Sequence, residues 1–182
     1  GSAPFTEARA DTEKGNDKVV IVLTDGANTY YTPTSVVAQD YSGSNYSYGG
    51  NDLAGAKSIY SNYGYAKNRS GDSRIFDGTS SISKTDFSNE NFSTAMTQHM
   101  SAICENAKAK NIIVMTVALD LKSSDQTEKK QIDALKECAS DSRSRRDGDG
   151  KPVKLFWNAT GGDLDQKFKE IGDELSNLRI VG

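Results

Sequence analysis

Unbroken apolar runs, separated by helix-like segments, form the main pattern of the chain. Residues 19–23 read Val-Val-Ile-Val-Leu and stop at Thr24-Asp25-Gly26, which predicts a strand over 18–24 that is buried on both faces. Similar runs predict strands at 112–119 and 153–157. Because the first run is hydrophobic all round, we expect its strand in the middle of a sheet rather than at an edge.

Three segments carry apolar side chains at spacings of three and four, which predicts amphipathic helices at 89–110, at 126–139 and from Leu164 onward. The side chains expected to be buried are Phe92, Met96, Met100, Ile103 and Ala107, then Ile132, Leu135 and Cys138, and finally Leu164, Phe168, Ile171, Leu175 and Leu178. Ser88 or Asn89 can cap the first helix, and Asp163 can start the last.

The order of these elements predicts an α/β fold. Strands that alternate with helices pair in parallel through right-handed crossovers, so we expect a doubly wound, mainly parallel sheet. A chain of 182 residues suits one domain, with 1–17 as a polar leading segment and 18–182 as the domain. Three strands make a thin sheet. The first is therefore expected to pair further, by dimerisation, strand exchange or use of the chain's own inserted segment.

That insertion covers residues 29–88. All eight tyrosines of the chain lie between Tyr30 and Tyr65, among Ser, Asn and Gly, and no strand or helix period persists there. A structureless loop of about 60 residues is improbable in a compact domain. We therefore expect a short helix at 53–60 and some irregular pairing. Binding loops and plain surface loops share this composition, and both interpretations stay open.

Charge and hydropathy exclude some classes of partner. The formal net charge is −3 and neither end carries a basic tail, so no electrostatic signal for nucleic acid is present. No apolar stretch approaches the ~20 residues of a membrane span, so we expect none in this chain.

Asp25 is the main candidate for chemistry, because it follows a strand at the carboxyl edge of a parallel sheet, where ligands and metals bind. A plain Asp-Gly turn is the alternative. Asp120, Asp125 and Glu128 either gather at that edge or cap helices. Asp147-Gly148-Asp149-Gly150 predicts a solvated hairpin turn, since the residues after it supply no further calcium ligand.

Other catalytic signals are weak. His99 is the only histidine and is expected at the surface or at a boundary. No nucleophile elbow, phosphate loop or dinucleotide fingerprint is present. Cys104 and Cys138 lack the spacing of a metal knuckle or redox pair, which leaves buried thiols or one disulfide.

Ordered blocks of the sequence carry a family resemblance. They are Ala3-Pro4-Phe5-Thr6-Glu7, the run Val20–Tyr30 with Leu-Thr-Asp-Gly-x-Asn-Thr-Tyr, Tyr63-Gly64-Tyr65, Ile103-Cys104, Lys108–Ile112, Thr116-Val117, Cys138-Ala139-Ser140, and the ending Phe168-x-x-Ile171 to Leu178-Arg179. Together they resemble the C-terminal part of TadG-like proteins, which are pilus-assembly proteins of bacterial tight-adherence systems with a von Willebrand factor A (VWA) domain. The resemblance covers most of the chain and is weakest over 31–60 and 141–152.

The resemblance implies a VWA fold with a metal-ion-dependent adhesion site at the carboxyl edge of the sheet. In the family, an Asp-x-Ser-x-Ser after the first strand, a later Thr and the Asp of the fourth strand hold the cation. Asp25 matches that last position, but no Asp-x-Ser-x-Ser follows a strand here, and 86–89 departs from it. The chain thus resembles the later half of the domain. We expect an incomplete site that holds Mg²⁺, Mn²⁺ or Ca²⁺ weakly.

The resemblance also implies a function without catalysis. It implies a bacterial cell-envelope location, periplasmic or extracellular, with an inner-membrane anchor upstream, and a protein partner that is a pilus or envelope component or a surface ligand. The possible binding face is Asn28, Thr29, Tyr30, Tyr31, Tyr46 and Tyr48, although capping of the next segment is the favoured role of Asn28 and Thr29. A disulfide between Cys104 and Cys138 is implied as well, and it would persist in an oxidising compartment. Two alternatives remain: an α/β-hydrolase-like or nucleotide-binding enzyme fragment, and a structural envelope spacer with a non-functional metal site.

Overall fold

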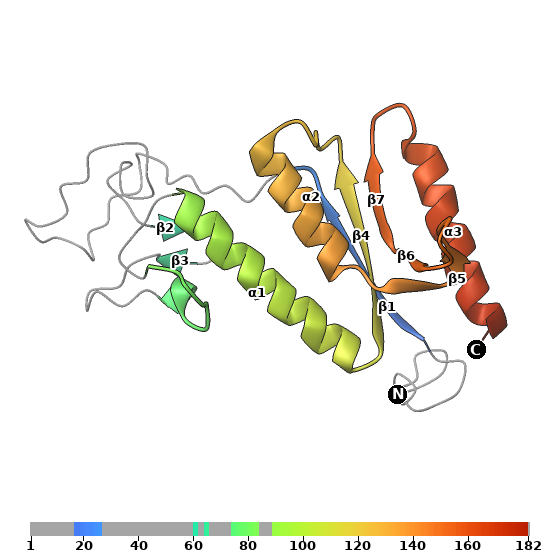
Figure 1. Cartoon of the computed structure of the whole chain (residues 1–182), viewed down its shortest axis with the longest axis horizontal. Coiled ribbons are helices and arrows are strands. Elements are labelled where there is room, and N and C mark those ends of the chain that lie inside the picture. Colours follow the sequence, from blue (N-terminus) through green and yellow to red (C-terminus); the bar gives the residue numbers. More distant parts are fainter. Residues whose placement is uncertain (1–16, 27–59, 62–63, 66–73, 84–88, 182) are drawn as a thin grey trace, which may run out of the picture. The chain divides into compact units, whose positions relative to one another are not determined.

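A computed structural model describes residues 17–26, 60–61, 64–65, 74–83 and 89–181 (Figure 1). The chain divides into two compact units, and each is described by itself. The larger unit contains residues 1–27 and 101–182, and the smaller contains 28–100.

The larger unit is built on a three-stranded parallel sheet in the order β1-β4-β7. The strands are β1 (Lys18–Thr24), β4 (Ile112–Leu119) and β7 (Phe156–Ala159). Thr24 pairs with Ala118, and Leu119 pairs with Ala159, so the carboxyl ends of all three strands meet at one edge. The mixed α/β class and the parallel sheet predicted from the sequence are confirmed.

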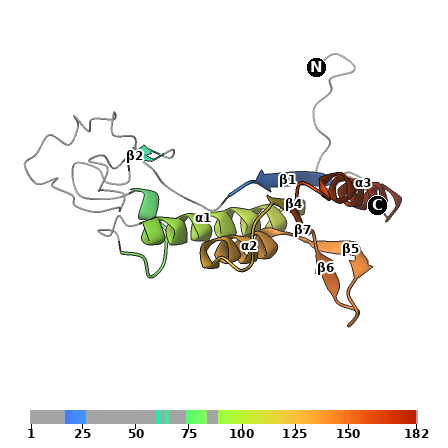
Figure 2. The ribbon, with the colours of Figure 1, turned by 90° about the horizontal axis from the view of Figure 1, so that it is seen from above.

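Helices cover both faces of β4. Ile113, Met115 and Val117 share a buried cluster with Ile171 and Leu178 of α3 (Leu164–Val181). On the other face lies α2 (Gln126–Cys138), where the Thr116 hydroxyl donates to the Leu135 carbonyl at 2.9 Å. Figure 2 shows α2 and α3 on opposite sides of the sheet. The sheet is therefore the middle layer of the unit, with β4 at its centre.

Among the strands that the structure describes, β1 lies at the edge of this sheet, contrary to the prediction of a central, fully buried strand. Val20, Ile21 and Leu23 are 47%, 46% and 54% exposed. The hydrophobic pattern correctly identified the strand. It could not show whether a neighbour is present on the far side, because that depends on pairing remote from the strand itself.

A disulfide ties the end of α1 (Asn89–Ala109) to the end of α2. Cys104 and Cys138 are both buried and bonded, as the family resemblance implied. Lys108 reinforces the junction by donating to the Glu137 carbonyl at 3.1 Å. Ile103, predicted to be buried, is 68% exposed, because the bond turns the adjacent Cys104 toward α2.

An antiparallel hairpin follows α2, made of β5 (Asp141–Arg146) and β6 (Pro152–Lys154). The predicted turn at 147–150 closes it, with the Asp147 carboxylate accepting from the Asp149 and Lys151 amides. The predicted single strand at 153–157 is wrong. It divides at Leu155, where the chain leaves the hairpin and joins β4: the Leu155 amide donates to Ser140, and its carbonyl accepts from Thr116.

In the smaller unit, the structure describes a short antiparallel pair, β2 (Tyr60–Ser61) with β3 (Gly64–Tyr65), and a 3₁₀ turn, η2 (Arg74–Phe76). Most of the predicted helix at 53–60 lies outside the described residues, but Tyr60 belongs to a strand. Phe76 is buried, and so is Phe92 near the start of α1, as predicted from its helical spacing. The Gln98 side chain of α1 accepts from the Ser80 amide at 2.7 Å and donates to the Ser80 carbonyl at 2.9 Å.

The last helix begins as predicted, but fewer of its apolar side chains are buried than the sequence indicated. Ile171 and Leu178 are buried, whereas Phe168 is 49% exposed. Within the part of the chain that the structure describes, no helix is both long and apolar enough to cross a bilayer.

Candidate functional site

Asp25 lies where the sequence placed it. It follows β1 directly, at the edge of the sheet where β4 and β7 also end, and its side chain is exposed. In Figure 1 the arrows of β4 and β7 point to this edge. The carboxylate is therefore free to meet a ligand that approaches the carboxyl end of the sheet.

Asp120 occupies the equivalent position after β4. It has a positive φ of 54°, a conformation that aspartate tolerates better than most residues, and it is exposed. Its amide donates to the Ala159 carbonyl at 2.7 Å, which fixes the turn out of β4. Since β1 and β4 are adjacent, two carboxylates follow neighbouring strand ends at the carboxyl edge.

The β4–β7 side of this edge is closed by Asn158. Its side-chain amide donates to the Leu121 carbonyl at 2.7 Å and accepts from the Leu121 amide at 3.3 Å. The Leu121 residue held by these two bonds is buried. The accessible part of the edge is therefore the β1 side, around Asp25 and Asp120.

The residues described there do not complete a cation site. No group of three or more His, Cys, Asp or Glu side chains that could hold a metal ion occurs in the described ranges. The Thr24 hydroxyl donates to the Gly26 carbonyl at 3.1 Å, so its hydrogen is already used in the loop. Because Mg²⁺ requires near-octahedral oxygen ligands, Asp25 fits as one ligand and further ligands have to come from elsewhere.

The other carboxylates considered for this edge have local roles. Asp125 caps α2, accepting from the amides of Thr127 and Glu128 at 2.8 and 3.0 Å. The Glu128 carboxylate accepts from the Lys122 amide at 2.6 Å. The capping alternative is thus the one that the structure supports for this pair.

The expected binding face lies outside the described residues. This holds for all of its members, Asn28, Thr29, Tyr30, Tyr31, Tyr46 and Tyr48. His99, in contrast, is described: its Nε2 lies 2.7 Å from the Ile75 carbonyl in the smaller unit. This is the boundary position predicted for it.

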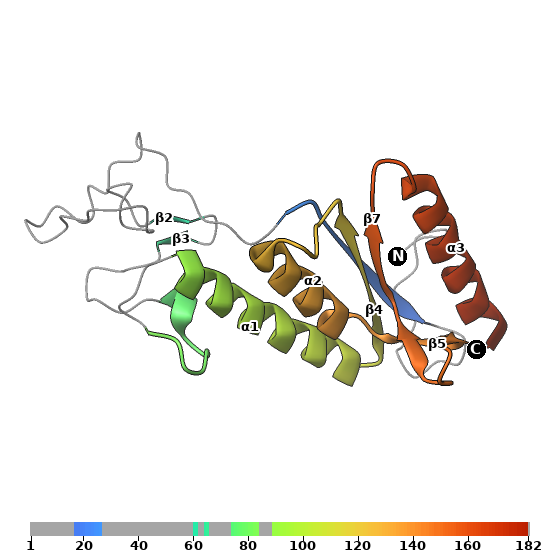
Figure 3. The same cartoon turned by 45° about the horizontal axis from the view of Figure 1, so that its top comes forward.

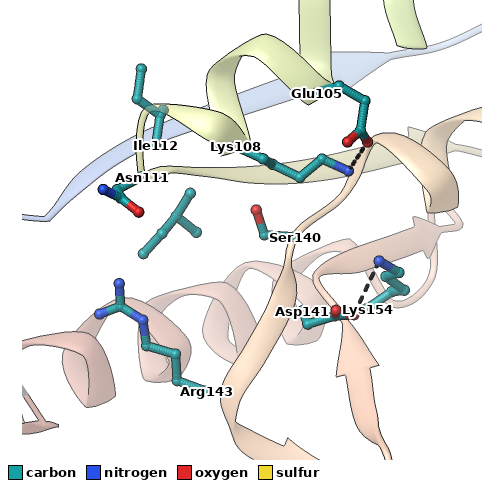
Figure 4. A pocket seen from close by; sticks show the side chains of 9 residues that line it. Glu105, Lys108, Asn111, Ile112, Ser140, Asp141, Arg143 and Lys154 are labelled. Atoms are coloured by element: carbon teal, nitrogen blue, oxygen red, sulfur yellow. Dashed lines mark ion pairs between the residues drawn. The ribbon is translucent and has the colours of Figure 1, made fainter. Parts of the chain in front are cut away.

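A concave region lies at the opposite, amino edge of the sheet (Figure 4). It is a hollow of about 310 Å³ between the end of α1, the start of β4 and the hairpin. Sequence reasoning missed it, because its residues come from segments that are far apart in the chain. They are Glu105, Lys108, Asn111, Ile112, Ile113, Ser140, Asp141, Arg143 and Lys154.

Each charged side chain that lines this amino-edge hollow forms an ion pair. Lys108 contacts Glu105 at 2.5 Å and Lys154 contacts Asp141 at 3.0 Å, as the dashed lines of Figure 4 show. Arg143 contacts Asp17 at 2.9 Å. The Ser140 hydroxyl oxygen accepts a hydrogen bond from the Val114 amide. An anionic ligand would have to displace these carboxylates, so the hollow is a structural junction between α1, β4 and the hairpin.

Comparisons with protein-family models, with curated proteins and with solved structures gave no match to this chain.

Proposed function

We propose that the chain is the later part of a VWA-like protein-interaction domain of the TadG-like kind, acting without catalysis in the bacterial cell envelope. The observation that carries the proposal is the position of Asp25, exposed and directly after an apolar parallel strand, at the edge where the neighbouring strands also end. Ligands of open α/β sheets bind at this edge.

In this proposal the partner is a protein, and it docks on the carboxyl edge. Asp25 would be one ligand of an adhesion cation, Mg²⁺, Mn²⁺ or Ca²⁺, with other ligands supplied from outside the described residues. The tyrosine-rich residues that follow Gly26 in the sequence would add specificity. The buried disulfide supports an oxidising compartment such as the periplasm or the cell exterior.

Thermal melting with and without each cation tests the proposal. At a concentration about ten times its Kd, a cation stabilises the folded state by about 1.4 kcal/mol. For a chain of this size that corresponds to a rise in Tm of about 3–6 °C. The Asp25→Ala variant is expected to lose the rise. Asp149→Ala, which removes an exposed carboxylate in the hairpin turn, is expected to keep it.

The outcomes separate the proposal from its alternatives. A rise that survives in Asp25→Ala places the cation elsewhere and contradicts the role of this residue. Absence of any rise leaves the chain as an envelope spacer with a non-functional site. Turnover of a generic ester or nucleotide would instead favour an enzyme fragment.

A further inference from the structure

The carboxyl half of α1 is held to α2 by its disulfide more than by apolar packing. Over residues 101–109, Cys104 is the one buried residue, and Ile103 is 68% exposed. The other residues of this stretch are exposed or only partly buried. Because apolar burial stabilises in proportion to the area removed from water, this stretch gains little from packing. The bond from Cys104 to Cys138 is therefore its main attachment.

The helix α2, in contrast, is fixed to the sheet without the disulfide. Its Leu135 is 1% exposed and accepts the Thr116 hydroxyl of β4 on its carbonyl. Directly after α2, the Ser140 amide donates to the Val114 carbonyl at 2.8 Å, and the Ser140 hydroxyl accepts from the Val114 amide at 3.0 Å. These contacts involve neither cysteine. The end of α2 that carries Cys138 therefore keeps its place on β4 whether or not the cysteines are bonded.

A short link provides a pivot between α1 and β4. The helix ends at Ala109 and β4 begins at Ile112, so only residues 110 and 111 connect them. Asn111 has a φ of 57°, the left-handed conformation that commonly follows the end of a helix. Residues at the ends of elements can absorb large changes of backbone angle. A change at this link can therefore swing α1 away from α2 and leave β4 in place.

We propose that the redox state of Cys104 and Cys138 controls the attachment of α1 to α2. In the reduced chain α1 opens away from α2 at residues 110–111, and oxidation attaches it. The Cys104 thiolate attacks the disulfide of an oxidant and forms a mixed disulfide, which releases one thiol. The Cys138 thiolate then attacks the Cys104 sulfur and releases the second thiol. The chain loses two electrons and two protons, and the oxidant's disulfide gains them.

The smaller unit continues directly into this switch. It ends at Met100, within α1, and Cys104 follows one turn later. Oxidation therefore fixes the helix into which the smaller unit continues, and it does so in an oxidising compartment such as the periplasm. The inference goes beyond the proposed function, because it involves neither a cation nor a docked partner.

Alkylation of a single thiol by iodoacetamide tests the proposal on the 182-residue chain. In Cys138→Ala, Cys104 is the only thiol and cannot form the bond. The matched reference is Val117→Cys in a Cys104→Ala and Cys138→Ala chain, because Val117 is fully buried in β4 and reacts only when the sheet opens. Cys104 is expected to react at least about tenfold faster than this reference, since local opening costs less than global unfolding. Circular dichroism establishes that each variant is folded.

Urea separates the release of α1 from global unfolding. A thiol that is exposed only by global unfolding should react about 5- to 150-fold faster for each molar of urea, because unfolding exposes a large surface. This acceleration is expected for the Val117→Cys reference. Cys104 is expected to react at nearly the same rate with and without about 1 M urea, because releasing α1 exposes little new surface. A Cys104 rate that equals the reference rate, or that rises as steeply with urea, overturns the proposal.

Oxidation of the reduced native chain tests the chemical step. With oxidised glutathione as the disulfide, the chain is expected to form the Cys104–Cys138 bond and to lose its reactive thiols, and dithiothreitol is expected to restore them. Mass spectrometry identifies the product. A mixed disulfide with glutathione that persists on Cys104 shows that α1 does not return to α2, which overturns the proposal. Neither experiment involves a cation, so its failure is separate from that of the proposed function.

Discussion

Asp163 fixes the start of α3 through bonds to the residue three positions earlier. Its carboxylate accepts from the Thr160 amide at 2.6 Å and from the Thr160 hydroxyl at 2.8 Å. Its own carbonyl accepts the Lys167 amide, the first bond of the helix. The backbone and hydroxyl bonds of Thr160 favour the ionised form and lower the pKa of Asp163, with Lys167 adding a smaller effect.

These bonds make the start of α3 sensitive to acid. The folded-state pKa of Asp163 lies below its unfolded value, so the carboxylate contributes stability above the unfolded pKa, and this contribution is lost as pH falls through the folded pKa. An NMR titration of the Asp163 carboxyl is expected to give a pKa below the ordinary 3.8. Thr160→Ala, which removes only the hydroxyl donor, is expected to raise it part of the way back. An Asp163 pKa at the ordinary value in the native chain would contradict the bonding.

At the residue scale, the sequence predicted the features that depend on near neighbours. Asp163 was predicted to start the last helix, and capping was one of the two interpretations left open for Asp125, because helix starts are decided within three or four positions. The exposure of Ile103 and Phe168 was not predicted. Which flank of a helix is buried depends on what packs against it. For Ile103 that is set by a bond from its neighbour Cys104 to a residue 34 positions away.

Between elements, a buried carboxylate links the hairpin to α3. Glu174 is 1% exposed and accepts from the Ser142 hydroxyl at 2.6 Å and from Arg145 Nε at 3.0 Å. The Arg145 guanidinium also lies 5.1 Å from the centre of the Trp157 ring. Figure 3 shows β5 close to the carboxyl end of α3. This polar cluster therefore holds the hairpin against α3.

Removing the Arg145 guanidinium, which pairs with the buried Glu174 carboxylate, is expected to destabilise the fold. Arg145→Met leaves the Glu174 carboxylate buried without its counter-charge, which costs about 2–4 kcal/mol, toward the low end because Arg145 is partly exposed. The matched Arg143→Met breaks an ion pair nearer the solvent and should cost at most about 1 kcal/mol. Urea denaturation measures both.

A second substitution isolates the pair itself. In Arg145→Met combined with Glu174→Gln, the buried group is neutral, so the double variant should lose less stability than the two single variants summed. Strict additivity would mean that Arg145 acts through its contact with Trp157 and not through Glu174.

At the element scale, the polar sequence explains why this hairpin strand was missed. The strand β5 reads Asp-Ser-Arg-Ser-Arg-Arg, with no apolar alternation to indicate a strand, and only Ser142 is buried in it. Its pairing with β6 and its anchoring by Glu174 come from residues later in the chain. The strands β1 and β4 were predicted with their observed bounds because apolar runs next to charged or turn residues are local signals.

Across the whole molecule, the fold class was more predictable than the site. The alternation of apolar runs with helical spacing shows the order of strands and helices. Strands that are connected through helices in this way pair in parallel. The position of Asp25 at the carboxyl edge follows from that order alone. Ligands beyond Asp25 and the paired charges of the amino-edge hollow require knowledge of which distant residues meet, and no periodic pattern encodes that.

The disulfide is expected to contribute to the stability of the chain as a whole. It joins residues 34 positions apart, and in the chain-entropy model a loop of that length raises the free energy of unfolding by about 4 kcal/mol at most. A Cys104→Ala and Cys138→Ala double variant should therefore lose about 2–4 kcal/mol in urea denaturation. The native chain in strong reductant should approach the double variant, because both lack the constraint on the unfolded state. If reduction leaves the unfolding midpoint of the native chain unchanged, the disulfide does not contribute to stability and the prediction is wrong.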